Sequence, residues 1–377
     1  MKLRRTWAVA RKEFLHIARD PRSLAMALVL PLLMLLLFGY ALTLDIDRIP
    51  TLVYDADRTP ESRELISRFQ GSRYFQVLGA ARDYRSVEDA IDRNQCLLGV
   101  VIFKDYARHL LSGREAQVQL LLDGSDSNTA SIGLGYAQAL LEAYDLELRA
   151  NALDRQGGGS AFSPIQPRLR VWYNPDLKSR NYIVPGLIAV ILMIIAALLT
   201  SLTIAREWEM GTMEQLISTP LRPAEVVIGK MAAFFALGVV DMVVAIVVGV
   251  SIFGVPLRGS ILFLALTSGM FLVGGLCWGI LISSIARSQL LAYQLGALTS
   301  FLPAFLLSGF VFAIENMPPA IQIVTYIFPA RYFVTILKGV FLRGVGARVL
   351  WSEAALLLIF AVIVFLAATR KLRQKVA

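Results

Sequence analysis

The hydrophobic residues of this chain are concentrated in long blocks that charged residues rarely interrupt. Four blocks contain no charged side chain, a fifth is broken only by Asp241, and the last, 354–369, extends backward through Trp351. An α-helix needs about 20 residues to cross a bilayer core of about 30 Å. The pattern therefore predicts six membrane-spanning helices, at residues 23–44, 181–205, 231–257, 259–286, 288–314 and 351–369.

The composition supports this interpretation and excludes other classes of protein. Of the 377 residues, 56% are hydrophobic and 17% are charged, whereas a soluble domain has about 45–50% apolar and about 25% charged residues. An outer-membrane barrel is excluded because its strands would alternate over about ten residues. The first block is too long for the apolar core of a secretory signal, which has about 7–15 residues. We therefore expect a polytopic α-helical membrane protein.

The distribution of Lys and Arg predicts the orientation in the membrane. With six spans, residues 1–22, 206–230, Arg287 and 370–377 share one side and carry 15 basic and 6 acidic side chains. The positive-inside rule places this side, and with it both termini, in the cytoplasm. The net charge of +9 equals the cytoplasmic excess, so it indicates topology and contact with anionic lipid rather than with nucleic acid. The short segments on the opposite side carry only Arg258, Arg331, Lys338, Arg343 and Arg348.

Residues 45–180 are long enough for one independent domain on the far side of the membrane. Helices are expected to begin at Thr59-Pro60 and at Ser86, which has capping-box spacing to Asp89, and a long helix covers 128–153. We expect a small α/β domain, with a flexible break at 156–160, and the sequence does not specify its strand order. Short apolar runs predict strands at 49–54, 74–78, 96–103, 118–122 and 169–173.

The sequence indicates no catalytic or metal-binding set. Neither His16 nor His109 has a partner arrangement, so surface or packing roles are favoured over catalysis. Asp123 and Asp126 form either a turn before a helix or a cation site, and the turn needs fewer assumptions. We expect no metal or cofactor in this chain. The two cysteines, which lie in different segments and are not expected to pair, are Cys96 and Cys277.

Residues 1–22 predict an amphipathic helix in the cytoplasmic membrane interface, ended by Asp20-Pro21. Its basic face includes Arg11, whereas its apolar face carries aromatic side chains that a merely solvated tail would leave in water. This apolar face consists of Leu3, Trp7, Ala10, Phe14 and Ile17.

The segment that follows the second block predicts a short helix on the cytoplasmic side. Pro220 ends this helix, and a new helix begins at Pro223. We interpret its surface as a docking site for another protein. The side chains that form this surface are Met213, Leu216 and Ile217 beside Glu209 and Glu214.

The pattern Glu-x-Glu-x-Gly-Thr-x-Glu-x-Leu-x-x-Thr-Pro at 207–220 resembles the coupling-helix segment of ABC-2 type permeases, the membrane subunits of ABC exporters. The order of parts, with a large domain after the first span, is similar to bacterial drug-efflux permeases. Further motifs that resemble the family are Tyr173-Asn-Pro175, Val184-Pro-Gly186, Ser283-Ser-Ile-Ala-Arg-Ser-Gln289, Met317-Pro-Pro319 and Phe328-Pro-Ala-Arg-Tyr-Phe333.

The resemblance implies a helix seated in a groove of a separate ATPase, which binds ATP and Mg²⁺. It also implies two ATPase copies, a second permease as homodimer or paired subunit, and a location in the bacterial inner membrane. Drugs or other amphipathic compounds are the expected exported class, although lipids, polysaccharide or ions also fit such a pathway. A periplasmic adaptor is expected by analogy. The coupling residues that it implies are Glu207, Glu209, Gly211, Thr212, Glu214, Leu216, Thr219 and Pro220.

The chain itself carries no phosphate-binding loop of the Gly-x-x-x-x-Gly-Lys-[Ser/Thr] kind. Its only Gly-Lys pair, Gly229-Lys230, is followed by Met231, and Ala224 occupies the position of the first glycine. We therefore expect the chain not to be an enzyme and the ATPase to be another polypeptide.

Three features stand out inside or near the membrane. Asp241 should face the protein interior, either on the translocation path or at a helix contact. Gly275 and Gly279 have GxxxG spacing, which favours packing within the bundle over packing across a dimer. Residues 315–350 predict an outer loop with two helices too short to span, 321–327 and 332–341, which form a broken or re-entrant pair. The resemblance implies that this pair of short helices forms an outer gate, which includes Pro329 and Tyr332.

A membrane-anchored sensor or scaffold, with a ligand-binding outer domain, is the alternative function. Substrate-dependent stimulation of ATP hydrolysis would distinguish a permease from a sensor or scaffold, because a scaffold does not stimulate hydrolysis. An intramembrane enzyme ranks third, since one acid and no histidine lie in the spans.

Overall fold

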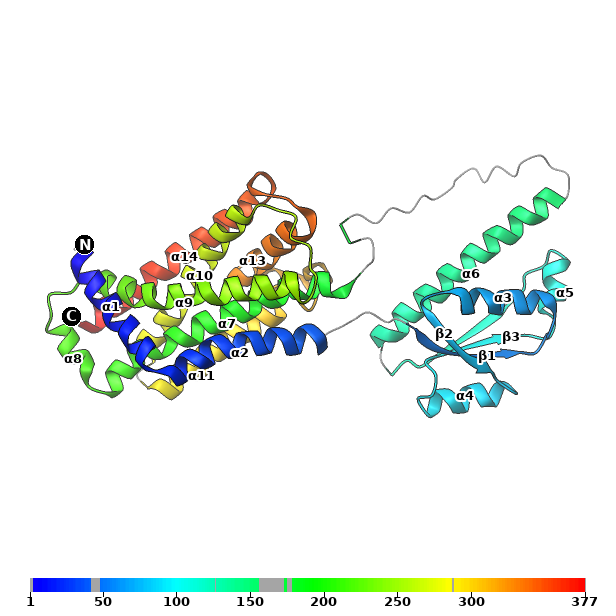
Figure 1. The fold of residues 1–377 in the computed structure, drawn as a ribbon, viewed down its shortest axis with the longest axis horizontal. Helices are drawn as coiled ribbons and strands as arrows, with labels where there is room; N and C mark the ends of the chain where they lie inside the picture. The colour runs from blue at the N-terminus through cyan, green and yellow to red at the C-terminus, as the bar shows by residue number, and fades with distance from the viewer. Residues whose placement is uncertain are drawn as a thin grey trace. The chain divides into compact units, whose positions relative to one another are not determined.

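The computed structural model describes residues 3–41, 48–125, 127–155, 173–174, 178–286 and 288–376. These residues are mostly helical, and the chain divides into two compact units. One unit, Met1–Leu44 with Val171–Ala377, is a helical bundle, and the other, Asp45–Arg170, contains a sheet (Figure 1).

The Asp45–Arg170 unit is built on a four-stranded sheet of order β2-β1-β3-β4. Strand β1 pairs in parallel with β2 and β3, and β4 is antiparallel to β3. Helices α3 and α6 cover one face of the sheet and α4 covers the other (Figure 1). The elements are β1 (Ile49–Asp55), α3 (Pro60–Gly71), β2 (Phe75–Ala80), α4 (Tyr84–Asp92), β3 (Leu98–Ile102), α5 (Tyr106–Leu111), β4 (Val118–Leu122) and α6 (Ser127–Arg155).

The first four predicted strands of this unit are confirmed, but the start predicted for α4 is wrong. The cap is Asp83, whose Oδ1 accepts a hydrogen bond of 2.8 Å from the backbone N–H of Ser86. Ser86 therefore lies inside the helix, because a carboxylate three residues earlier caps the first turn. The predicted break at 156–160 and the strand at 169–173 lie outside the described residues, except that Tyr173 forms a bend.

The other helices of the bundle unit surround α7, which is buried along most of its length. The start of α1, helix α8 and the end of α14 lie at the same end of the bundle (Figure 1). Its helices are α1 (Leu3–Arg19), α2 (Pro21–Ala41), α7 (Ser179–Glu209), α8 (Thr212–Ile217), α9 (Pro223–Ser251), α10 (Ile261–Ile285), α11 (Gln289–Leu306), η1 (Ile314–Asn316), α12 (Pro319–Thr325), α13 (Pro329–Lys338), the π-helix η2 (Gly339–Arg343) and α14 (Ala347–Val376).

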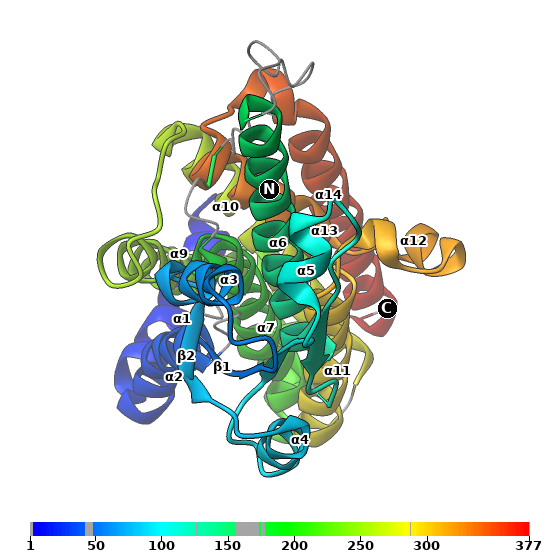
Figure 2. The same ribbon diagram turned by 90° about the vertical axis from the view of Figure 1, so that its right-hand side faces the viewer.

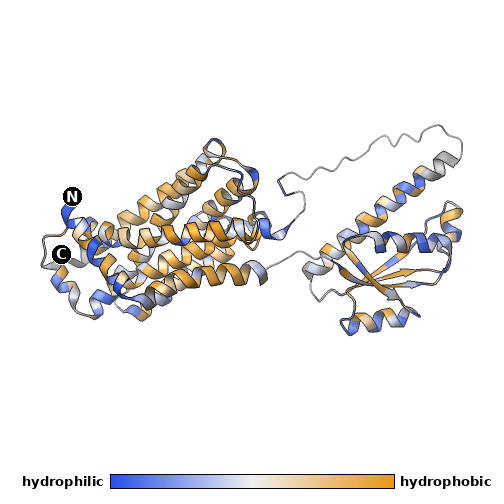
Figure 3. Ribbon diagram, in the orientation of Figure 1, coloured by the Kyte–Doolittle hydropathy of each residue, from blue (hydrophilic) through white to orange (hydrophobic). Residues whose placement is uncertain are grey.

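Within the described ranges, five helices are long and apolar enough to cross a membrane: α7, α9, α10, α11 and α14. The count rises to six if α12 and α13–η2, bent by 86°, form one span, and α2 contains a shorter apolar helix, Ala27–Ala41. Most residues of the bundle helices are hydrophobic (Figure 3), and many large apolar side chains are exposed, among them Val243, Leu262 and Ile363. This exterior is typical of a multi-pass membrane protein.

Several helix ends differ from the blocks seen in the sequence. Helix α9 begins at Pro223 and continues through Lys230, so this lysine is not a boundary. Helix α11 ends at Leu306, and Gly309 then turns the chain with a left-handed φ of 77°. Helix α14 begins at Ala347 and has non-helical φ and ψ angles at Leu350.

The GxxxG pair packs within the bundle, which confirms the favoured interpretation. A Cβ atom on Gly279 would lie 2.1 Å from Thr200 Oγ1 and 2.3 Å from the carbonyl oxygen of Ala197, both on α7. A Cβ on Gly275 would lie 3.1 Å from Ala196 Cβ on the same helix. The absence of side chains at both positions lets α10 approach α7 closely.

The predicted pair of short helices near residues 315–350 is present as α12 and α13. Figure 2 shows α12 standing away from the other helices of the bundle, and its Ile323 and the following Ile327 are exposed. Helix α13 is instead buried, with Phe333 and Leu337 fully enclosed. The two helices therefore lie at different depths in the same unit.

Candidate functional site: the α1–α7–α8–α9 junction

Helix α1 packs against α9 through a face that carries Val9, Ala10 and Glu13. A Cβ on Gly229 would lie 2.6 Å from Val9 Cβ and 3.0 Å from the carbonyl oxygen of Thr6. Gly229 thus allows the two helix backbones to approach each other. The Gly-Lys pair of the sequence serves helix packing at this place.

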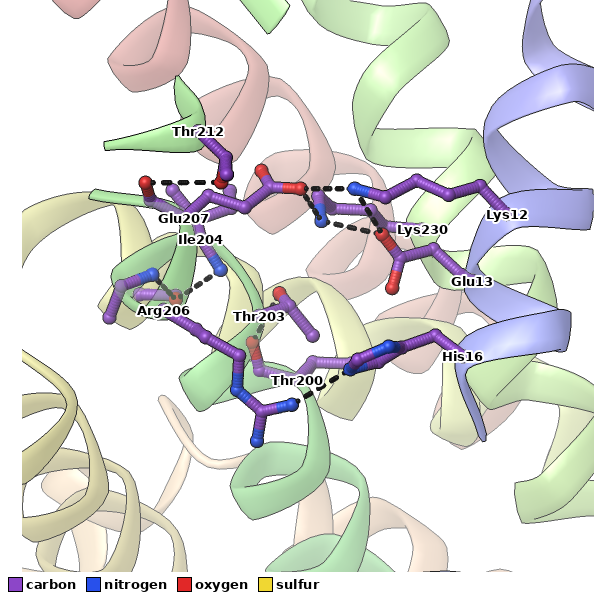
Figure 4. A network of polar contacts seen from close by, with 12 residues as sticks. Lys12, Glu13, His16, Thr200, Thr203, Ile204, Arg206, Glu207, Thr212 and Lys230 are labelled. Atoms are coloured by element: carbon purple, nitrogen blue, oxygen red, sulfur yellow. Dashed lines mark hydrogen bonds and ion pairs between the residues drawn. The ribbon is translucent and has the colours of Figure 1, made fainter. Parts of the chain in front are cut away.

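Lys230, directly after this contact, is the centre of a buried ion network (Figure 4). Its Nζ donates to Glu13 Oε1 at 2.8 Å and to Glu207 Oε1 at 2.9 Å. Lys12 Nζ donates to the same Glu207 oxygen at 2.8 Å. The network, consisting of Lys12, Glu13, Glu207 and Lys230, joins α1, the end of α7 and the start of α9.

Burial makes the network strongly dependent on its three enclosed side chains, Glu13, Glu207 and Lys230. The side chain of Lys230 is 1% exposed and those of Glu13 and Glu207 are 7% and 8% exposed. Lys12 lies at the solvent-facing edge of the network, and its side chain is 57% exposed. Burial lowers the pKa of Lys12, but the hydrogen bond and charge of Glu207 outweigh this, so the pKa is raised. A buried charge that lost its partner here would cost several kcal/mol.

Helix α8 follows the end of α7, a few residues beyond Glu207. The sequence predicts that this end of the bundle faces the cytoplasm. Gly211 adopts a left-handed φ of 69°, which reverses the chain between α7 and α8. Met213 is buried in a cluster with Ile204 of α7, Val227 of α9 and residues of α10 and α14. Met213 therefore anchors α8 in a hydrophobic cluster that α7, α9, α10 and α14 share.

The expectation that Met213 belongs to the docking surface of α8 is wrong, because this side chain packs inside the bundle. Met213 is 1% exposed and Leu216 is half-buried, while the side chain of Ile217 lies outside the described set. Glu214 and Gln215 are exposed instead. Among the described side chains of α8, the fully exposed ones are polar, and Met213 holds the helix to its own chain.

The other implied coupling residues have distinct positions. Glu207 lies inside the ion network, so its side chain faces the permease itself. Thr212 Oγ1 donates to the Glu207 carbonyl at 3.4 Å, and exposed Thr219 donates to the Leu216 carbonyl at 2.6 Å. The Pro220 carbonyl accepts a hydrogen bond from Arg5 of α1. The structure brings these residues together around one junction.

Two of the motifs that carry the family resemblance meet beside this junction. Ser283 Oγ accepts hydrogen bonds of 2.9 Å from the backbone N–H groups of Ile204 and Ala205. Glu209 Oε1 accepts a hydrogen bond of 2.7 Å from the N–H of Gln289, at the start of α11. The turn between α10 and α11 is therefore fastened to the end of α7.

His16 has a partner that the sequence did not indicate. Arg206 Nη1 lies 3.0 Å from His16 Nε2 (Figure 4). Because a guanidinium group only donates, Nε2 of His16 accepts and the ring is the neutral tautomer with its proton on Nδ1. The expectation that His16 has no partner is therefore wrong.

The amphipathic helix α1 is present, but its predicted apolar face is divided. Ala10 is buried against the bundle, whereas Trp7 is 65% and Phe14 44% exposed. Arg11, also exposed, lies on the same outward side as the two aromatic residues by helical spacing. An aromatic and basic outer stripe is typical of a helix in the membrane interface.

The candidate pathway residues lie apart from this junction along the chain. Asp241 on α9 is 2% exposed, and none of the described residues donates to its Oδ2. Pro329 begins α13, and Tyr332 donates to the carbonyl of Tyr326 at 2.6 Å. Asp241 thus faces the interior as expected, and Tyr332 ties α13 to the end of α12.

Sequence reasoning missed Lys12, Glu13, Lys230 and a half-buried lysine, Lys338. Lys338 Nζ donates to the Gly309 carbonyl at 2.9 Å and lies 3.5 Å from the centroid of the Tyr182 ring. One available signal was Glu13, an acid at helical spacing to Val9 and Ala10 on an otherwise basic helix. The other was Lys230, placed two turns after the helix start at Pro223.

Comparison with known proteins extends over almost the whole chain. Residues 21–370 match the model of the ABC-2 family transporter protein family. Over 371 residues the chain is 37% identical to an Escherichia coli (strain K12) protein named "Probable multidrug ABC transporter permease YbhS", covering 97% of this chain and 96% of that protein. A second protein of this strain, "Probable multidrug ABC transporter permease YbhR", is 32% identical and covers 99% of each chain.

A more distant relative is similar over a slightly shorter range. The "Inner membrane transport permease YhhJ" of E. coli is 25% identical over 335 residues, covering 87% of this chain and 86% of that protein. The match to the family model begins at the start of α2 and ends within α14, so it includes α7, α8 and α9 of the junction and leaves out α1. The chain therefore belongs to the ABC-2 family of transporter proteins.

Proposed function

We propose that this chain is the transmembrane permease subunit of an ATP-binding cassette exporter, driven by a separate ATPase that binds ATP and Mg²⁺. The observation that carries the proposal is α8, which presents Glu214 and Gln215 outward while Met213 holds it to the bundle. A short helix fixed so firmly to spanning helices can pass a displacement to them, because packed elements move as units.

The proposal includes an assembly and an orientation. Two ATPase copies act on two permease subunits in the inner membrane of a bacterium. The two permeases are either two copies of this chain or this chain and a different permease. Cytoplasmic termini are supported by the position of α8 and both chain ends at one end of the bundle and by the positive charge of those segments. The Asp45–Arg170 unit then lies in the periplasm, where it can meet an adaptor.

The names of the relatives support drugs or other amphipathic compounds as the exported class. Helix α1 lies in the cytoplasmic interface of the membrane, with Trp7 and Phe14 among the lipids and Arg11 toward the headgroups. The ion network holds this helix to α7 and α9. A movement of α8 that displaces α7 is therefore passed on to α1 through this network.

Affinity purification of the tagged full chain in mild detergent tests the proposal. We expect recovery of an ATPase that hydrolyses ATP, and we expect Glu214→Lys to lose this partner and ATP-dependent efflux while membrane insertion is retained. The matched control is Glu88→Lys, an exposed acid of the other unit. A well-assembled chain without a nucleotide-binding partner would support the sensor or scaffold instead.

A further inference from the structure

A cavity of about 900 Å³ lies directly beside the ion network, between α1, α2, α7, α8, α9 and α11. This volume is within the range of small-molecule sites, which are mostly apolar with a few polar groups. Leu30 on α2 and Tyr293 on α11 line the cavity and are 42% and 50% exposed, so its wall continues into the lipid-facing surface.

The cavity has two chemically different ends. The part inside the bundle is apolar and lined by Ala27, Leu30, Ile195, Leu198, Leu199 and Phe234. The end toward α8 carries charged side chains of α1 and of the last turns of α7. A ligand that fills both ends must therefore be an amphiphile with one polar head.

The charges at the polar end favour an anionic head. Lys12 and Lys230 neutralise Glu13 and Glu207, and Glu207 Oε2 is enclosed by protein. The remaining charged groups of the lining are two arginines against one carboxylate: Arg5, Arg206 and Asp20.

Arg206 is the group best placed to bind that head. It lies 3.0 Å from His16 Nε2 and 3.4 Å from Gln289 Oε1, which are both neutral acceptors. A guanidinium group has five N–H donors, and its charge here has no carboxylate within the described ion pairs. An anionic oxygen would form charge-assisted hydrogen bonds with it.

We propose that this cavity binds an amphiphile with an apolar body and a single anionic headgroup, held by Arg206, as the substrate to be exported. This inference rests on the proposed function and names its substrate class. The ligand reaches the cavity from the inner leaflet beside Leu30 and Tyr293, with its tail against α7 and its head below α1. Binding there touches the same helices that the ion network connects to α8.

The test uses the full complex with its ATPase in nanodiscs of phosphatidylcholine. The probe is 11-(dansylamino)undecanoic acid, and its comparison is the dansyl alkylamine of the same chain length. We expect saturable binding of the acid with clear preference over the amine, and stimulation of ATP hydrolysis by the acid. Equal or tighter binding of the amine would overturn the inference.

Substitutions locate the binding. Arg206→Gln should weaken binding of the acid by about tenfold or more, Arg206→Lys should retain part of it, and Leu199→Trp should block it by filling the apolar end. The control Arg348→Gln changes an exposed arginine outside the lining and should bind as the unchanged chain does. Equal binding by Arg206→Gln and Leu199→Trp would place the probe elsewhere and overturn the inference.

Two further results separate the alternatives. If phosphatidylglycerol in the nanodisc displaces the acid and the acid leaves ATP hydrolysis unchanged, the cavity is a lipid site and the substrate assignment fails. If the chain purifies without an ATPase but still prefers the acid, the proposed function fails while the cavity chemistry stands. Should Arg206→Gln not fold, the acid-over-amine preference of the unchanged chain decides.

Discussion

The ammonium group of Lys230 lies 2.8 Å from the carboxylate of Glu13, although 217 residues separate the two along the chain. This ion pair fixes the N-terminal helix to α9, and Glu207 extends it to α7. All three side chains are at least nine-tenths buried. The junction that holds α8 is therefore built on charges that have little contact with water.

Lys230→Met should destabilise the protein strongly. The substitution leaves the Glu13 and Glu207 carboxylates buried without their shared cation, and loss of one partner of a buried ion pair costs about 3–5 kcal/mol. We expect a lower unfolding midpoint in detergent, measured by intrinsic tryptophan fluorescence during heating.

Lys12→Met is the matched control, because Lys12 contacts the same carboxylates but its side chain is 57% exposed. Exposed ion pairs contribute about 0–1 kcal/mol, so the midpoint should change little. Combining Glu13→Gln and Glu207→Gln with Lys230→Met should recover part of the lost stability. Equal losses for Lys12→Met and Lys230→Met would contradict the buried network.

Gly279→Ala should separate α10 from α7. The added Cβ would lie 2.3 Å from the Ala197 carbonyl oxygen, and a backbone atom cannot move aside as the end of a flexible side chain can. Overpacking of this kind costs about 1–3 kcal/mol. Gly269→Ala in the same helix meets only Phe235 Cζ at 3.8 Å, so it should be tolerated. Comparing the two unfolding midpoints checks the contact, and a tolerated Gly279→Ala would argue against it.

Gly99→Ala should disturb the sheet unit, because its Cβ would lie 2.3 Å from Val87 Cγ1 of α4. We expect faster amide exchange in α4, measured by hydrogen–deuterium exchange on the full chain. Gly71→Ala, with no atom within 4 Å of the added Cβ, is the control and should leave α4 unchanged. Unaltered exchange after Gly99→Ala would show that α4 is not packed on β3 as described.

Local sequence signals predicted those parts of the molecule that depend on local interactions. The strand at Val118–Leu122 and the helix beginning at Pro60 were found because apolar runs and caps act within a few residues. The short α8 was found for the same reason, since Gly211 and Pro220 lie at its two sides.

The ion network could not be found in this way. In the sequence Lys230 marks the edge of a predicted span, because an isolated charge is costly in the membrane, and its partner Glu13 lies 217 residues away. The orientation of α8 was also hidden, because Met213 on a short amphipathic helix suits docking and internal packing equally well. Long-range contacts decided both cases.

Asp241→Asn should maintain or raise the stability of the protein. Asp241 is 2% exposed and its Oδ2 has no donor among the described residues. The spanning parts of α2, α7, α10 and α14, which pack against α9, carry no Lys or Arg that could pair with it. An unpaired buried carboxylate is unfavourable, and an amide of the same shape removes the charge. We expect an unchanged or higher unfolding midpoint. A large decrease would show that the charge of Asp241 has a partner, which a second permease subunit would have to provide.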